Sequence, residues 1–162
     1  MKRSLYVSGW MMVLGLLALI PASAFGEERS TLERATLEVA GETLSVEVAR
    51  QADERSRGLM ERDALAPNAG MLFVYANPQP PEAAFWMYRT RIPLDIAFLG
   101  AEGEIRAIRR MLPCQAASSA ECPSYAAKVP FRAALEVNAG YFDRHDIEVG
   151  DRLPITPLLS PR

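Results

Sequence analysis

The chain has little of the chemistry on which most catalytic centres depend. It contains one histidine, His145, and two cysteines, Cys114 and Cys122, among 162 residues. A Ser-His-Asp hydrolase would have to use that histidine, and no Gly-x-Ser-x-Gly motif is present. Zinc usually needs more nitrogen and sulfur ligands than remain once the two cysteines pair, and no glycine-rich phosphate loop occurs. We therefore expect neither a metal site nor a cofactor.

Concentrated positive charge is also missing. The chain has 18 Lys and Arg residues against 20 Asp and Glu residues, for a net charge of −2. If residues 1–24 are removed, Lys2 and Arg3 leave with them, and the remaining chain has a net charge of −4. Because binding to nucleic-acid phosphates requires clustered Lys and Arg side chains, we expect no nucleic-acid partner.

The first 24 residues have the pattern of a cleavable signal peptide. Lys2 and Arg3 precede an uncharged, apolar stretch over residues 5–20, which Pro21 interrupts before Ala22-Ser23-Ala24. Small residues at such a position are what signal peptidase requires. The apolar stretch is also shorter than the roughly 18–20 residues that span a bilayer. The sequence predicts a periplasmic or secreted protein, cleaved after Ala24, with membrane contact only through the signal peptide; the alternative is an uncleaved anchor.

Cys114 and Cys122 are separated by seven residues. In an oxidising compartment the default for such a pair is a disulfide. It would close a short loop and stabilise the fold by about 2–3 kcal/mol on the chain-entropy estimate. The alternative is redox or thiol chemistry. The spacing is not Cys-x-x-Cys and the segment is predicted as a loop, so the sequence favours the structural disulfide.

Hydrophobic alternation and turn residues predict a mainly β domain. Alternation over residues 36–49, with a turn at Gly41-Glu42, predicts a β-hairpin, and residues 52–56 before Gly58 predict a short helix. Further strands are predicted at 71–75, 84–89, 94–99, 104–111, 131–137 and within 147–153, with an irregular proline-rich loop at 77–81, the disulfide loop at 113–130 and a turn or short helix at 138–144. About seven short strands with one or two short helices indicate a single compact β-barrel or β-sandwich. We expect it to cover residues 36–153, between a flexible segment at 25–35 and a loose C-terminal tail at 154–162.

Several segments, in order, resemble the family called domain of unknown function 192. They are residues 57–62 running on to 73, Phe85-Trp86-Met87 with residues 90–95, and residues 134–140 with Gly150-Asp151 close behind. The resemblance covers nearly all of residues 36–153. It implies a compact, mostly β fold, often secreted or bound to the bacterial envelope, and no established activity. One departure is that the family usually has Lys-Asn-Thr where this chain has Tyr88-Arg89-Thr90.

Two carboxylates are the first candidates for chemistry. Asp95 is predicted on a strand face that also carries Ala97 and Leu99, where a carboxylate is costly unless it is paired. It is either a general base or ligand anchor with a raised pKa, or a structural partner of an arginine or of backbone amides. Glu136 shares a predicted strand face with Arg132. Either this face is solvated, or Glu136 forms an acidic pair with Asp95. Two convergent carboxylates could perform acid–base hydrolysis or hold a hard cation such as Ca²⁺, and the spacing establishes neither.

Three other candidates each have a structural and a functional interpretation. Arg57, just before Gly58, could pack against the helix end. Alternatively, it could bind a carboxylate or phosphate through two parallel hydrogen bonds. Trp86 shares a predicted strand face with Tyr88, and the pair could be core or a stacking platform for a sugar or another flat ligand. Asn138 is expected to cap the short helix that follows it.

The predicted function follows by elimination of the standard catalytic sets. It is a non-enzymatic envelope module that binds a small ligand, a glycan or a partner protein. The cleft would be framed by six residues: Arg57, Trp86, Met87, Asp95, Glu136 and Asn138. One alternative is a hydrolase or lyase that uses Asp95 and Glu136 as acid and base, which requires the two carboxylates to lie within about 10 Å of each other. Another is a purely structural or assembly protein.

Overall fold

The computed structural model describes residues 32–160, so the predicted signal peptide and most of the predicted flexible segment lie outside the described residues. Within residues 32–160 the fold is mainly β, as predicted, with eight strands and two short α-helices. In chain order the elements are β1 (Glu33–Val39), β2 (Glu42–Ala49), α1 (Ala52–Arg57), β3 (Ala69–Gln79), β4 (Ala84–Trp86), β5 (Leu94–Leu99), β6 (Ile105–Met111), the 3₁₀ helix η1 (Ser119–Glu121), β7 (Ser124–Ala126), β8 (Phe131–Asn138), α2 (Tyr141–Arg144) and the 3₁₀ helix η2 (Thr156–Leu158).

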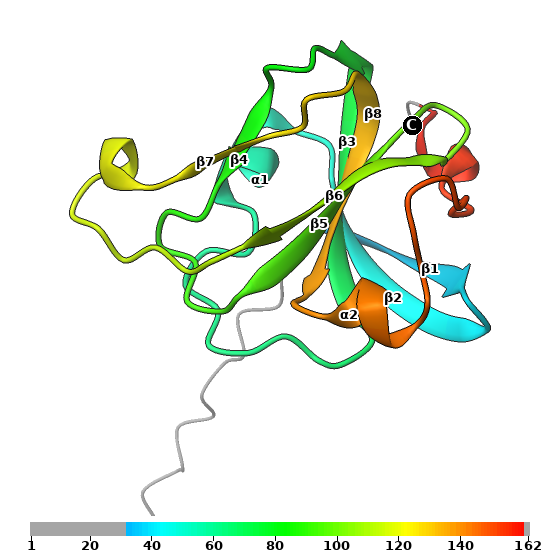
Figure 1. The fold of residues 1–162 in the computed structure, drawn as a ribbon, viewed down its shortest axis with the longest axis horizontal. Coiled ribbons are helices and arrows are strands. Elements are labelled where there is room, and N and C mark those ends of the chain that lie inside the picture. The colour runs from blue at the N-terminus through cyan, green and yellow to red at the C-terminus, as the bar shows by residue number, and fades with distance from the viewer. Residues whose placement is uncertain (1–31, 161–162) are drawn as a thin grey trace, which may run out of the picture. The chain divides into compact units, whose positions relative to one another are not determined.

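Six strands form one sheet in the order β1-β2-β3-β8-β5-β6, and β4 and β7 form a separate two-stranded sheet. All neighbours in the large sheet are antiparallel except β2 and β3, which are parallel. A parallel connection requires a crossover, and here the crossover contains α1. The sheets do not close into a barrel, so the sandwich-like alternative is the one that fits. Figure 1 shows α1 together with β4 and β7 at the left of the large sheet, and β1 and β2 at the lower right.

Short-range sequence signals account for the predicted hairpin and for α1. Ala40 and Gly41 both have positive φ, as a two-residue hairpin turn with the twist of its strands requires, and the hairpin of β1 and β2 is confirmed. At the start of α1, the carboxylate of Glu54 accepts the backbone N–H of Gln51 at 2.8 Å. Gly58, at φ 48°, ends the helix where predicted. Its backbone conformation is costly for other residues.

Two buried hydrophobic clusters pack on the large sheet. Alternate residues of a strand point to opposite faces, so Leu72 and Leu135 belong to one cluster, and Met71 and Phe73 to the other. The α2-side core joins sheet residues to Tyr141, Phe142, Ile147, Leu153 and Ile155. The other, called the pocket-side core because a pocket opens beside it, joins sheet residues, Phe131 of β8 among them, to Leu59, Met87 and Ala127. Within residues 32–160, no helix has both the length and the hydrophobicity to cross a bilayer.

Five segments differ from the sequence prediction. The predicted irregular loop at 77–81 begins as strand, because β3 continues through Pro78 to Gln79. Its register with β8 shifts between Val74 and Gln79, so the missing N–H of the proline interrupts no ladder bond. The strand predicted at 84–89 ends at residue 86, and the predicted disulfide loop contains β7. Residues 147–153 form no strand and contribute one isolated bridge, Glu104 to Arg152. The predicted C-terminal tail contains Ile155, which is fully buried.

Candidate functional site

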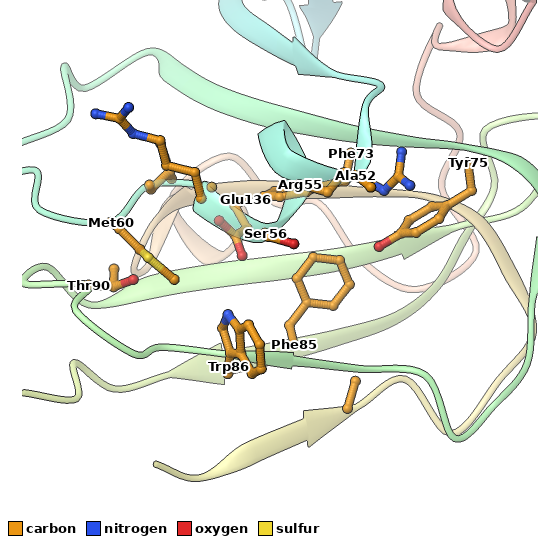
Figure 2. Close-up of a pocket in the computed structure, with 14 residues that line it drawn as sticks. Ala52, Arg55, Ser56, Met60, Phe73, Tyr75, Phe85, Trp86, Thr90 and Glu136 are labelled. Carbon is orange, nitrogen blue, oxygen red and sulfur yellow. The ribbon is translucent and has the colours of Figure 1, made fainter. Parts of the chain in front are cut away.

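A pocket of about 290 Å³ opens on the face of the large sheet that carries the pocket-side core. Its lining comes from α1 and the turn after it, from β3, from β4 and the segment that follows, and from a single residue of β8, Glu136. Figure 2 shows the Glu136 carboxyl group facing this space, with Ser56 and Met60 on one side and Phe85 and Trp86 on the other. Segments far apart in sequence therefore converge on one carboxyl group.

Glu136 is the residue that sets the electrostatics of the pocket. Its side chain is 4 % exposed, and it makes no hydrogen bond or ion pair with any residue in the described part of the chain. Its cross-strand neighbours, Met71 on β3 and Ile96 on β5, are fully buried. Burial away from water raises the pKa of Glu136 to about 8, because the charged form loses its hydration. The carboxyl group is therefore mostly protonated at pH 7 and can gain or lose a proton near neutral pH.

Apolar side chains form one part of the walls around this carboxyl group. Phe73 and Leu59 are buried, and the rings of Phe73 and Phe85 meet edge to face with centroids 5.1 Å apart. Trp86 is 50 % exposed although it is a large aromatic residue. It lines the pocket where the pocket reaches solvent, which favours the stacking-platform interpretation of this residue over the core interpretation.

Two arginines bring positive charge to the same pocket. The guanidinium group of Arg55 lies 4.7 Å from the ring centre of Tyr75 and donates to the backbone oxygens of Val74, at 3.2 Å, and Arg50. Burial raises the pKa of Tyr75, and Arg55 opposes that rise. Arg57 also lines the pocket and is exposed. It makes no hydrogen bond or ion pair within residues 32–160. The positive groups are thus one fixed arginine and one free arginine.

The disulfide supports one wall of the pocket. Cys114 and Cys122 are bonded, as predicted. Cys114 forms isolated bridges with Tyr88 and Thr90, and its carbonyl oxygen accepts the Arg89 N–H at 2.9 Å. Thr90, which is 4 % exposed, lines the pocket. The disulfide loop therefore holds the segment after β4 in place behind the pocket.

Three of the six predicted cleft residues line the pocket, and three do not. Arg57, Trp86 and Glu136 do. Met87 does not, because its side chain is 1 % exposed and packs in the pocket-side core. Asn138 also lies elsewhere and donates to the carbonyl oxygens at positions 65 and 66, at 3.2 and 2.9 Å. The capping role expected for Asn138 is wrong: Gly140 is the N-cap of α2.

Asp95 is a structural carboxylate. It is 2 % exposed and accepts two bonds from Arg110, at 2.8 and 3.1 Å, and one from the N–H of Gly140 at 2.6 Å. Across strands β5 and β8, Asp95 lies opposite Val137, whereas Glu136 lies opposite Ile96. Residues directly opposite each other share a face, so Asp95 and Glu136 point to opposite faces of the sheet. The proposed acid–base pair is therefore wrong. Among residues 32–160, no group of three or more His, Cys, Asp and Glu side chains is arranged to hold a metal ion.

Several residues of the pocket were not predicted from the sequence: Arg55, Ser56, Met60, Tyr75, Phe85 and Thr90. One signal was available for two of them. Ala52, Arg55 and Ser56 follow the i, i+3, i+4 spacing of a single helix face, which α1 turns towards the pocket. No short-range pattern could place Tyr75 and Phe85 beside that face, because the contact depends on the packing of β3 and β4.

A pocket built on a twisted, mostly antiparallel sheet, with one buried carboxyl group and no metal-ligand cluster in the described residues, defines a small β domain with a ligand-sized cavity. The chain belongs to the family DUF192, described as an uncharacterized ACR, which it matches over residues 35–155. No functionally curated protein matches the chain.

Among the solved structures that are similar to the chain, two share about a third of its sequence. One is a protein of Sinorhizobium meliloti 1021 described as a candidate transcription regulator. It is 35 % identical, with a TM-score of 0.62, over 74 % of this chain and 90 % of that one. The other is a protein of unknown function from Novosphingobium aromaticivorans DSM 12444. It is 31 % identical, with a TM-score of 0.62, over 75 % of this chain and 84 % of that one.

Proposed function

We propose that this protein is an exported domain that binds a small organic ligand in the pocket around Glu136. The observation that carries the proposal is a buried carboxyl group that faces a cavity and has no partner in residues 32–160. A buried polar group without a hydrogen bond costs about 1–3 kcal/mol. A functional role for the cavity accounts for a residue that otherwise destabilises the fold.

Asp95 provides an internal comparison. Both carboxyl groups are almost fully buried in adjacent strands. Asp95 has an arginine and a backbone N–H as partners, as a structural carboxylate should. Glu136 has neither, although aromatic and aliphatic side chains form part of the pocket that it faces. The contrast supports a ligand role for Glu136, and it argues against the view that all of the motif residues serve the fold.

The volume of the pocket limits what can enter it. At about 290 Å³ it lies at the lower end of the range for ligand pockets. A glycan or an envelope protein would therefore bind through a single sugar ring or a single side chain. The half-exposed Trp86 is placed to stack on such a group. A free small molecule with a flat or aliphatic body fits the apolar walls best.

Export is supported by two independent features. The Cys114–Cys122 disulfide is of a kind that persists in oxidising compartments, and residues 1–24 have the composition of a signal peptide. Expression of the full chain in a bacterium, followed by mass spectrometry of the protein released from the periplasm, tests this part. The expected product begins at Phe25 and contains the disulfide. Full-length, reduced protein retained in the cytoplasm would contradict it.

Ligand binding can be followed with a single fluorophore. The chain has two tryptophans, Trp10 and Trp86, so the full chain with Trp10→Phe reports on the pocket alone. Titration with 2-phenylethanol, a neutral probe of suitable size, should change the Trp86 emission saturably. Phe85→Ala should weaken that binding, because the substitution removes a wall of the pocket, whereas the exposed-site control Val149→Ala should not. Absence of saturation, or an equal response in the Phe85→Ala variant, would contradict the proposed function.

A further inference from the structure

The pocket contains an acidic group and a basic group in different environments. Glu136 is 4 % exposed, while Arg57 is exposed to solvent, and both line the same cavity. Neither side chain has a partner in residues 32–160. Two unpaired groups of opposite character, one buried and one in water, form complementary binding points for a molecule that itself carries both charges.

The buried end is suited to an ammonium group. An ionised carboxylate that is almost fully buried and has no hydrogen-bond partner in residues 32–160 gains most from a cation. Neither arginine of the pocket pairs with Glu136 in the described residues: Arg55 is held by two carbonyl oxygens and the face of Tyr75, and Arg57 makes no ion pair.

The exposed end is suited to an acidic group. A guanidinium group binds a carboxylate with two parallel hydrogen bonds, and Arg57 is free to make them. A simple amine would leave both Arg55 and Arg57 facing a cation, which is unfavourable. An anionic group on the ligand removes that repulsion. The two arginines therefore select against a lone positive charge and in favour of a zwitterion.

We propose that the ligand is a small zwitterion of the amino-acid type, whose ammonium group binds Glu136 and whose acidic group binds Arg57, with an apolar side chain against Phe73 and Phe85. This inference rests on the proposed function, because it assumes that the pocket binds a ligand. It goes further by assigning the charges of the ligand and the residues that bind each charged group.

The pH dependence of binding follows from the groups that face Glu136. The charged or titratable residues that line the pocket, within the described part of the chain, are Arg55, Arg57, Tyr75 and Glu136. Guanidinium groups do not deprotonate in proteins, and burial raises the pKa of Tyr75 above its ordinary value of 10.0. Only Glu136 therefore titrates near neutral pH, with a pKa of about 8. Because an ammonium ligand requires the ionised carboxylate, its affinity should rise about tenfold from pH 6 to pH 7.

Four probes that share a benzene ring on a short chain separate the possibilities: L-phenylalanine, phenethylamine, 3-phenylpropionate and 2-phenylethanol. Each is titrated into the full chain carrying Trp10→Phe at pH 6 and pH 7, and Trp86 emission is recorded. L-Phenylalanine should bind at least about tenfold more tightly than 2-phenylethanol at pH 7, the equivalent of one charge-assisted pair. Its affinity should rise with pH, and that of 2-phenylethanol should stay constant.

Three variants assign the two ends of the ligand. Glu136→Gln should abolish the pH dependence for L-phenylalanine and reduce its affinity about tenfold or more, while 2-phenylethanol still binds. Arg57→Gln should weaken L-phenylalanine and leave phenethylamine unchanged or tighter. The exposed control Glu148→Gln should change neither. Circular dichroism and urea denaturation at pH 5 verify that each variant folds.

The outcomes distinguish this inference from the proposed function. Equal affinity for L-phenylalanine and 2-phenylethanol, or tighter binding of 3-phenylpropionate than of L-phenylalanine at pH 7, would overturn the zwitterion while leaving a pocket that binds ligands. Failure of all four probes to saturate would remove the proposed function and this inference together. Retention of the pH dependence in Glu136→Gln would overturn the assignment of the ammonium end.

Discussion

Replacement of Glu136 by glutamine should make the protein more stable at alkaline pH and change it little at pH 5. Burial raises the pKa of Glu136 from 4.5 to about 8 in the folded state. Between these two values the folded chain keeps a proton that the unfolded chain has lost. Folding stability therefore falls as pH rises through this window, and it is independent of this group below 4.5 and above 8. Glutamine does not titrate, so the variant escapes that loss.

The size of the effect follows from the same two pKa values. Each pKa unit corresponds to about 1.4 kcal/mol, so ionisation of Glu136 in the folded state costs about 5 kcal/mol. Small domains have about 5–15 kcal/mol of total stability. The wild-type protein should thus lose a substantial fraction of its stability between pH 5 and pH 9, and Glu136→Gln should retain most of that fraction.

Urea denaturation of the oxidised full chain at pH 5, 7 and 9 measures this difference. Because all other titrating groups are shared, they cancel when the free energy of unfolding of the wild type is subtracted from that of the variant. The difference should be near zero at pH 5 and rise with pH to several kcal/mol at pH 9. Glu148→Gln, which changes an exposed carboxylate, should give a flat difference. Parallel profiles for Glu136→Gln and the wild type would refute the inference that burial raises this pKa.

Three further perturbations test the framework around the pocket. Reduction of the disulfide should lower the free energy of unfolding by about 2–3 kcal/mol and weaken probe binding; an unchanged urea midpoint with unchanged binding would contradict its role as support for the wall. Asp95→Asn should lower the free energy of unfolding by about 2–3 kcal/mol, which is less than for a fully buried ion pair because Arg110 reaches solvent. The folded variant should bind 2-phenylethanol as the wild type does. Gly70→Ala should cost about 1–3 kcal/mol and weaken binding, because its Cβ would lie 2.6 Å from the carbonyl oxygen of Glu136; unfolding and binding curves that match the wild type would show that β3 and β8 can separate freely.

The two carboxylates show which features the sequence could predict and which it could not. Alternation correctly made Asp95 a buried residue that needs a partner, and the structure provides Arg110. Alternation within one strand does not reveal the register between two strands. The pairing of Ile96 with Glu136 places Asp95 on the other face of the sheet. A shift of one residue in that register would have reversed the outcome.

Local chemistry determined much of this protein directly from its sequence. The hairpin of β1 and β2, the end of α1 at Gly58, the mainly β class and the Cys114–Cys122 disulfide all depend on residues close together in the chain. The pocket depends on contacts between residues that are far apart in the sequence. The crossover between β2 and β3 carries Arg55 to the face from which Glu136 projects, and β4 closes that face with Phe85. Only tertiary packing decides which side chains meet there, because strand register and crossover position are properties of the whole sheet.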